Sequence, residues 1–219
     1  MPNTENLTEE VLYSSPNNTS IPSHGDEDLV MHWFPMRVVY DKVLLVNRTL
    51  EKLSVEHYLA LEEKIDISSG KPRVVSVPII DDLIFVRSTK KHITELKHGS
   101  AHCQHLRFIT FIPRLEMRNG MTEMEKDAVR RIVVVPDAEM SQFFQAINQT
   151  TNHVTIIPYK DVFKYIGHKI RILQGPLAGC IGTLRRIKKN KRVCIDCGIF
   201  LTAELGYMPK EMYEIIEKI

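Results

Sequence analysis

Four side chains that can bind a metal stand within eight positions of this sequence, at His98, His102, Cys103 and His105. Imidazole and thiolate are common zinc ligands, and zinc can activate water for hydrolysis, so a loop could wrap these groups around one catalytic ion. The alternative is a set of surface histidines with no shared ligand. Stoichiometric zinc in the purified protein would indicate a metal-dependent enzyme acting on nucleic acid.

A second pair of candidate ligands occurs in the run Cys194-Ile195-Asp196-Cys197. This spacing is typical of a metal knuckle or a redox pair. The run lies in a predicted strand, however, where residues three apart point to opposite faces, and no second such pair exists in the sequence. We therefore expect buried, reduced thiols at Cys194 and Cys197, and likewise at Cys103 and Cys180.

Motifs of other enzyme classes are missing from the sequence. It contains no Ser–His–acid grouping, no HExxH pattern and no glycine spacing of the P-loop or dinucleotide-binding type. We therefore expect no catalytic residue, no metal and no other cofactor, and we look for a binding function instead.

Charge is distributed unevenly along the 219 residues, although the net charge is only +2. Residues 1–36 carry six acidic residues and no Lys or Arg, whereas residues 185–192 carry six basic ones. The basic run is either a phosphate-binding surface or a solvated hairpin turn. Residues 1–30 are polar and poor in apolar side chains, so we expect a disordered tail there. No segment has the apolar length of a membrane helix or the pattern of a secretory signal, which favours the cytoplasm.

Strands and helices alternate over residues 31–147, which predicts an α+β domain with helices packed on a mainly antiparallel sheet. Strands are expected at 33–40, 83–86, 107–112 and 132–135, and an irregular hairpin is expected to pair 55–61 with 73–78. Helices are expected from Asp41, from Thr89 and from Pro136. In the last of these, Met140, Phe143, Phe144 and Ile147 recur at the spacing of one helical face.

The periodicity breaks after residue 147, and residues 148–160 are a candidate linker. Beyond it, short segments rich in Val, Ile and Gly at 169–173, 181–187, 192–196 and 199–205 predict strands. Residues 161–219 are therefore expected to form a small all-β barrel.

The first two of these strands flank a loop in which Gly175, Pro176, Gly179 and Gly182 follow an apolar strand. Glycine permits positive φ in such a tight loop. The pattern resembles the KOW motif of NusG-type and ribosomal proteins, and it implies an SH3-like barrel. The alternative is an unrelated glycine hairpin.

Three more segments, at residues 33–38, 77–86 and 134–140, occur in the order and spacing of the NusG amino-terminal domain. The run Asp81-Asp82-Leu83-Ile84-Phe85-Val86 looks more like the specialised UpxY-type paralogues than housekeeping NusG, which usually has an aromatic-Pro-Gly-Tyr run there. The resemblance covers about residues 31–219. It implies a transcription elongation factor or antiterminator, acting in operons for surface (capsular) polysaccharides.

The resemblance also implies partners and sites. NusG-type domains sit on the clamp helices of the largest subunit of RNA polymerase through an apolar depression, and its candidates here are Trp33, Phe34, Ile79, Ile80, Leu83 and Phe85. Each of these side chains could equally belong to the domain core. Comparable places to those that read non-template DNA in specialised paralogues are occupied by Lys42, Arg48, Arg87, Lys90 and Lys91. Nascent RNA is a further candidate partner.

The second domain is expected to bind a ribosomal protein or a termination factor, and the chain is expected to act as a monomer without membrane contact. Packing against the first domain could change the fold of the second. The alternative function is a ribosome-associated KOW-domain protein that binds RNA. Co-purification with polymerase or with ribosomal particles separates the two.

Overall fold

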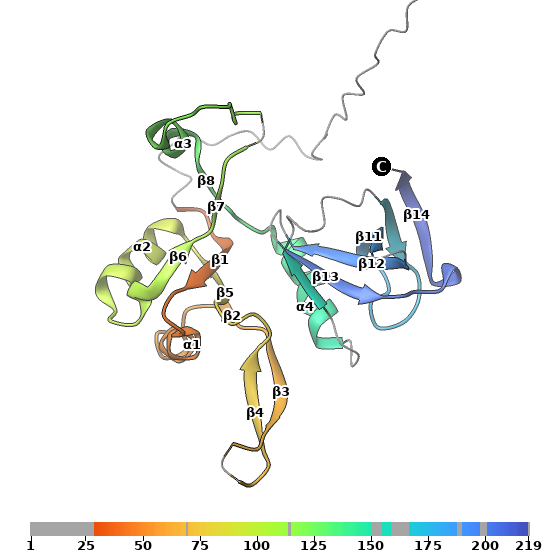
Figure 1. Ribbon diagram of the computed structural model, residues 1–219, viewed down its shortest axis with the longest axis horizontal. Coiled ribbons are helices and arrows are strands. Elements are labelled where there is room, and N and C mark those ends of the chain that lie inside the picture. The colour runs from red at the N-terminus through yellow and green to blue at the C-terminus, as the bar shows by residue number, and fades with distance from the viewer. Residues whose placement is uncertain are drawn as a thin grey trace, which may run out of the picture.

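A computed structural model describes residues 29–68, 70–113, 115–149, 155–158, 167–187, 190–197 and 201–218. The chain is a mixture of helices and antiparallel sheets (Figure 1). In order, its elements are β1 (His32–Val38), α1 (Val43–Lys52), β2 (His57–Tyr58), β3 (Leu61–Asp66), β4 (Arg73–Pro78), β5 (Leu83–Ser88), α2 (Lys90–Gly99), η2 (Cys103–His105), β6 (Leu106–Phe108), β7 (Thr110–Phe111), α3 (Glu123–Val129), β8 (Arg131–Ile132), α4 (Asp137–Gln149), β9 (Thr155–Pro158), β10 (His168–Ile172), β11 (Ile181–Ile187), β12 (Asn190–Cys197), β13 (Leu201–Gly206), η3 (Lys210–Met212) and β14 (Tyr213–Lys218).

The first sheet has the strand order β2-β5-β1-β6, and its strands pair antiparallel. Aromatic and β-branched residues dominate β1 and β5, which explains why both extend into strands. Side chains alternate between the two faces of a strand. On one face Phe34 and Met36 pack with Val46 of α1 and Ile93 of α2 in a buried cluster. The α+β expectation for this part of the chain is met.

Two excursions leave this sheet. The β3–β4 ribbon and the segment containing β7, α3 and β8 extend away from it in different directions (Figure 1). The ribbon pairs Leu61–Asp66 with Arg73–Pro78, so the expectation that residues 55–61 pair with 73–78 is wrong. Residues 57–58 instead form β2 beside β5. The charged run Glu62-Glu63-Lys64 has low strand propensity and concealed β3 in the sequence.

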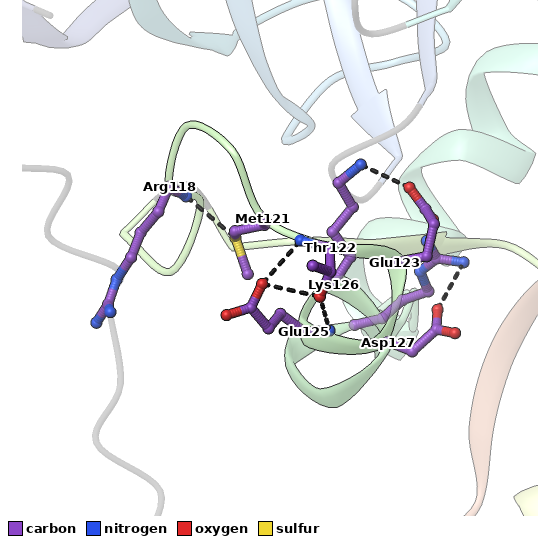
Figure 2. Close-up of polar contacts among 8 residues, drawn as sticks. Arg118, Met121, Thr122, Glu123, Glu125, Lys126 and Asp127 are labelled. Atoms are coloured by element: carbon purple, nitrogen blue, oxygen red, sulfur yellow. Dashed lines mark hydrogen bonds and ion pairs between the residues drawn. The ribbon is translucent and has the colours of Figure 1, made fainter.

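Helix α3 is held by its own N-terminal hydrogen bonds. The Thr122 hydroxyl accepts from the backbone N–H of Glu125, and the Glu125 carboxylate accepts from the N–H of Thr122, which forms a capping box (Figure 2). Lys126 pairs with Glu123 at 2.6 Å. No residue of α3 is buried, so local contacts rather than packing keep this helix in place.

The second sheet, which we call the C-terminal sheet, has the order β14-β10-β11-β12-β13-β9 and is antiparallel throughout. Strands β10 to β13 fall close to their predicted positions. Gly175 and Gly179 both have positive φ, at 85° and 89°, in the turn between β10 and β11. At Gly182 an added Cβ would lie 2.9 Å from the carbonyl oxygen of Cys194, so the close approach of β11 and β12 requires glycine.

Two features of this half were not predicted. Residues 155–158, within the expected linker 148–160, form the edge strand β9 that pairs with β13. Residues 213–218 form β14, which pairs with β10. No helix among the described residues is long and apolar enough to cross a membrane. The expected tail, residues 1–30, lies outside the described residues up to position 28.

Candidate functional site

The second face of the first sheet is apolar and aromatic. Trp33 from β1 and the alternating residues Leu83 and Phe85 from β5 point to it, and all three are buried. Phe34 lies on the opposite face with α1 and α2. Of the two neighbouring candidates, Phe34 thus belongs to the core on the helix side, because adjacent residues of a strand point to opposite sides.

Helix α4 covers this apolar face. Phe144 meets Trp33 edge-on with ring centroids 5.3 Å apart, and Phe143 lies 5.5 Å from Phe85. Tyr58 adds a ring 4.3 Å from Phe144, and burial raises the pKa of Tyr58 to about 12. Aromatic pairs of this kind contribute about 0.5–1.5 kcal/mol beyond the area that they bury. These five aromatic residues form the interface between the first sheet and α4.

The two remaining candidates for the depression lie at its rim. Ile79 and Ile80 are half-buried in the connection between β4 and β5. Ile80 packs against the buried cluster, whereas the backbone N–H of Ile79 donates to the carbonyl of Ala60 at 2.9 Å. Ile80 is thus the candidate with both a partly accessible side chain and contact with the apolar face.

Helix α4 also packs against the C-terminal sheet. One buried cluster runs from the first sheet through α4 into strands β10 to β13. Its members are Trp33, Leu83, Phe85, Val135, Met140, Phe143, Ala146, Ile170, Ile172, Leu177, Cys180, Leu184, Val193, Ile195, Cys197 and Ala203. The apolar face of the sheet is therefore closed by α4, and α4 is closed by the second half of the chain.

Two glutamines of α4 bind the glycine-rich turn of the C-terminal sheet. The side-chain carbonyl of Gln142 accepts from the backbone N–H of Ile181 at 2.8 Å. Gln145 donates to the carbonyl of Pro176 at 2.8 Å and accepts from the Cys180 thiol at 3.2 Å. We call Gln142 and Gln145 the glutamine latch. Pro176 belongs to the predicted KOW pattern, which thus contacts the first half of the chain.

Sequence reasoning missed the glutamine latch. The only sequence signal for it was the spacing of Gln142 and Gln145. These two amides are three positions apart and stand beside the apolar stripe that contains Met140 and Phe143. Nothing in that spacing indicates which partner the amides would meet. Their role emerges only when α4 packs on two sheets.

Arg87 fastens the start of α4. Its Nε and Nη2 donate to the two carboxylate oxygens of Asp137 at 3.1 and 3.2 Å, and its Nη1 lies 3.1 Å from Glu56. The hydrogen bonds from Arg87 hold the pKa of Asp137 below its usual range, and hydrogen bonds to Asp137 and Glu56 raise the pKa of Arg87. The guanidinium predicted to meet nucleic acid is thus engaged by two carboxylates of its own chain.

The other four predicted nucleic-acid residues are solvent-exposed. Lys42 and Arg48 lie at the start and on the surface of α1, and Lys90 and Lys91 open α2. Both helices lie on the sheet face opposite α4. The structure thus separates these cations from Trp33, Leu83 and Phe85, which lie on the other face of the same sheet.

Within the basic run 185–192, the side chains that the structure describes serve the C-terminal sheet. Arg185 is buried and lies 2.9 Å from Asp196, which also accepts from the hydroxyls of Thr183 and Thr202. Arg192 lies 3.4 Å from Glu204. The other basic side chains of the run lie outside the described ones. The run lies on the hairpin of β11 and β12, in which Arg185 and Arg192 form ion pairs with acidic residues of the same sheet.

The candidate metal ligands of the sequence differ in burial. Cys194 and Cys197 are both fully buried in β12, and burial raises the pKa of Cys194 to about 12 and that of Cys197 further. Cys103 is buried beside α2, while His98 and His102 are exposed. In the described part of the chain, no three His, Cys, Asp or Glu side chains are arranged to hold a metal ion.

No protein-family model and no curated protein matches the sequence. Among solved structures, the chain is similar to one titled "Domain interaction in Thermotoga maritima NusG". The two share 12% sequence identity with a TM-score of 0.36, over 86% of this chain and 98% of that chain.

Proposed function

We propose that this chain is a non-enzymatic transcription elongation factor or antiterminator of the NusG type that binds RNA polymerase and suppresses pausing or premature termination. The observation that carries the proposal is the aromatic sheet face at Trp33, Leu83 and Phe85, because this apolar face is covered by α4 and the C-terminal sheet, which follow later in the same chain. The segments that resemble the NusG amino-terminal domain include these three residues.

In this proposal the described arrangement is a closed state. The apolar face becomes available to the clamp helices of polymerase when α4 and the C-terminal sheet move away from it. A ligand that binds only the open state shifts the population toward it, and no catalytic group is needed. The half-buried Ile80 at the rim would make the first contact.

The exposed cations Lys42, Arg48, Lys90 and Lys91 would approach nucleic acid on the opposite side of the sheet. Phosphate contacts of this type position a protein without reading sequence. Arg87 would act differently, by holding Asp137 and the start of α4. Gly175, Pro176, Gly179 and Gly182 would present a KOW-type loop to a ribosomal protein or a termination factor once the glutamine latch is released.

The sequence of residues 81–86 favours a specialised factor of the UpxY type, working in the cytoplasm on operons for surface polysaccharides. This finer assignment is tested separately from polymerase binding. Transcription in vitro past a terminator on leader templates from such operons should show more readthrough with the protein than without it. Equal readthrough on these and on unrelated templates would remove the operon assignment and leave the general one.

Polymerase binding is tested with a matched pair of substitutions. Ile80→Lys places a charge at the rim of the apolar face, and Ile65→Lys places the same charge on the exposed β3 ribbon, where Ile65 is 71% exposed. We expect Ile80→Lys to weaken capture of purified polymerase by about tenfold, since a desolvated charge opposes apolar docking. Ile65→Lys should leave capture unchanged.

Both variants must first give the circular dichroism spectrum of the unmodified protein. Equal capture by the two variants would overturn the apolar docking site. Capture of ribosomal particles without polymerase would instead favour the ribosome-associated alternative.

A further inference from the structure

The β3–β4 ribbon is a sheet of only two strands, and it extends away from the rest of the chain (Figure 1). Ile65 of β3 lies directly opposite Val74 of β4, and the two side chains are 71% and 68% exposed. Among the described residues, no third strand pairs with either edge of the ribbon. A free strand edge with exposed apolar side chains is a template for pairing with another strand. The ribbon is therefore a candidate interaction surface.

The backbone of β4 presents hydrogen-bonding groups on its free edge. The N–H of Ile79 donates to the carbonyl of Ala60 at 2.9 Å, so these two residues are a bonded pair across the ribbon. Bonded and non-bonded pairs alternate in an antiparallel ladder, and the register runs without interruption along both strands. Val74 and Ser76 consequently occupy non-bonded positions, and their N–H and C=O groups point away from β3. Pro78, which has no N–H to donate, falls in the same alternate set.

Charged side chains protect the edge of β3 but not that of β4. β3 contains the run Glu62-Glu63-Lys64 and ends at Asp66, whereas the only charge in β4 is Arg73. The Arg73 guanidinium lies 3.5 Å from the carboxylate of Asp66, so its charge is balanced within the ribbon. Residues 74–77 are valines and one serine, which favour a strand and do not oppose pairing. The free edge of β4 is thus the edge that can accept another strand.

We propose that β4 pairs antiparallel with β4 of a second copy of this chain, with Val74 on the two-fold axis. The backbones of the two Val74 residues would donate to and accept from each other. The N–H of Ser76 would donate to the Pro72 carbonyl of the other copy, in both directions. A single strand then supplies both sides of the contact, which is the self-complementarity that a two-fold interface requires. The two ribbons would form one sheet in the order β3-β4-β4-β3.

The exposed apolar side chains decide the register. With Val74 opposite Val74 of the second copy, the Ile65 and Val74 side chains of both copies form one continuous row on one face of the joined sheet. A shift of two positions would place Val74 opposite Ser76 and interrupt this row. Apolar side chains that lie directly opposite each other are the contacts that stabilise a sheet, so the register centred on Val74 is favoured.

The charges on the other face are compatible with this register. Val75 would lie opposite Arg73 of the second copy, whose guanidinium is balanced by Asp66 of that copy. Within its own ribbon Val75 is paired with Lys64. Each row on this face therefore ends at Lys64 of one copy and at Asp66 of the other. Opposite charges at the two ends favour the pairing of two copies, and no uncompensated like charges meet on the axis.

The contact is small, so the dimer is expected to be weak. One short strand per copy falls below the total of about 1,200 Å² at which stable interfaces begin. We expect an equilibrium between monomer and dimer, which replaces the expectation of a monomer at high protein concentration. The pairing uses none of the residues assigned to polymerase or nucleic acid, so it stands independently of the proposed function.

Sedimentation equilibrium of the full chain, from about 5 to about 500 µM, measures the pairing. The average mass should rise with concentration toward that of a dimer. Val74→Lys places two like charges opposite each other at the axis, and we expect it to weaken association at least about tenfold. Met124→Lys is the matched control, because Met124 is an apolar side chain on α3 that is 81% exposed. It should leave association unchanged.

A second variant tests the backbone contact. Ser76→Pro removes an N–H that points away from β3, and proline is tolerated on an edge strand at such a position. We expect association to weaken at least about tenfold, because the donor to the second copy is lost. The N–H groups of Val75 and Val77 point toward β3, so their protection from hydrogen exchange should persist in the variant. Such protection shows that the ribbon itself is intact.

A chain that stays monomeric at every concentration would overturn the proposal and would leave the edge to a strand of a different protein. A dimer that survives both Val74→Lys and Ser76→Pro would also overturn it. Loss of the dimer in Met124→Lys alone would place the contact on α3 instead. Capture of polymerase is measured separately with Ile80→Lys, so a monomeric chain that captures polymerase would refute the pairing and leave the proposed function intact.

Discussion

The side-chain carbonyl of Gln142 on α4 accepts a hydrogen bond of 2.8 Å from the backbone N–H of Ile181, at the first residue of β11. This bond joins α4, which covers the first sheet, to the end of the turn between β10 and β11 in the C-terminal sheet. A net hydrogen bond contributes about 0.5–1.5 kcal/mol, so this bond adds a small increment to the apolar packing of α4 between the two sheets.

Loss of the glutamine latch should expose the only tryptophan of the chain. In Gln142→Ala/Gln145→Ala the closed state loses its polar contacts, and we expect Trp33, now 6% exposed, to show red-shifted emission and about twofold stronger quenching by acrylamide. Gln104→Ala, an exposed glutamine on η2, is the matched control. Emission that is identical in all three proteins would show that the latch does not hold α4 against the sheet.

The ion pair of Arg87 with Asp137 should make the folded state sensitive to acid. The pKa of Asp137 is lowered in the folded state, so its stabilising contribution is complete above the unfolded value near 3.9 and is lost as the pH falls toward the folded value. Urea midpoints between pH 3 and pH 7 measure this loss. Asp137→Asn should remain folded at pH 7 with a lower midpoint and should show a weaker fall below pH 4. A fall as steep as that of the unmodified protein would exclude Asp137 as its source.

Removal of the capping box should loosen α3 alone. Thr122→Ala removes the acceptor for the N–H of Glu125, and loss of an N-cap costs about 1 kcal/mol. Because α3 has no buried residue, we expect about fivefold faster amide exchange at Glu125 and Lys126 with no change in melting temperature. Thr94→Ala in the middle of α2 serves as the control for threonine removal. A lower melting temperature in Thr122→Ala would mean that α3 supports the core.

The ion pair of the buried Arg185 with the half-buried Asp196 should be costly to break and cheap to replace. Asp196→Ala leaves the buried guanidinium without its carboxylate, and we expect about 3 kcal/mol of destabilisation in urea unfolding. Arg185→Met/Asp196→Leu should recover most of this loss, because no charge then remains buried. A double variant that is as unstable as the single one would show that the pair itself, rather than the stranded charge, carries the stability.

All four thiols should be inert in the folded protein. Cys103, Cys180, Cys194 and Cys197 are free and buried, and burial raises the pKa of Cys194 to about 12. The thiolate is the reactive form, so a thiol reagent at pH 8 should label them about a hundredfold more slowly before unfolding than after it. Elemental zinc is measured on the same samples. Rapid release of two thiols by a chelator would revive the zinc hypothesis.

The sequence was most informative where one period dominates. Met140 and Phe143 of α4 are buried as the helical spacing predicts, and Phe144 and Ile147 of the same stripe pack against that core while half-buried. The continuous apolar run at β5 is buried on both faces. These elements are recognisable because burial, period and propensity agree. The glycine-rich turn is a further example, since Gly175 and Gly179 occupy positive φ.

Elements that depend on a distant partner were hidden. β14 exists because residues 213–218 pair with β10 more than forty positions earlier, and β3 exists because its charged residues pair with β4. Phe34 shows a different difficulty: the residue type indicates a buried strand, but only the register against β5 decides the face. The glutamine latch likewise needs two sheets and a helix to meet before its partners are defined.

Because α4 completes the hydrophobic cores of both halves, neither half can melt by itself without leaving Phe143 and Met140 in water. Calorimetry would then record a single cooperative transition in place of two. The shared helix also constrains how the two halves evolve. A substitution on α4 that improves packing with one sheet also changes packing with the other. In many multidomain proteins each domain folds independently. Here the two halves would become independent only if α4 left one of the two sheets.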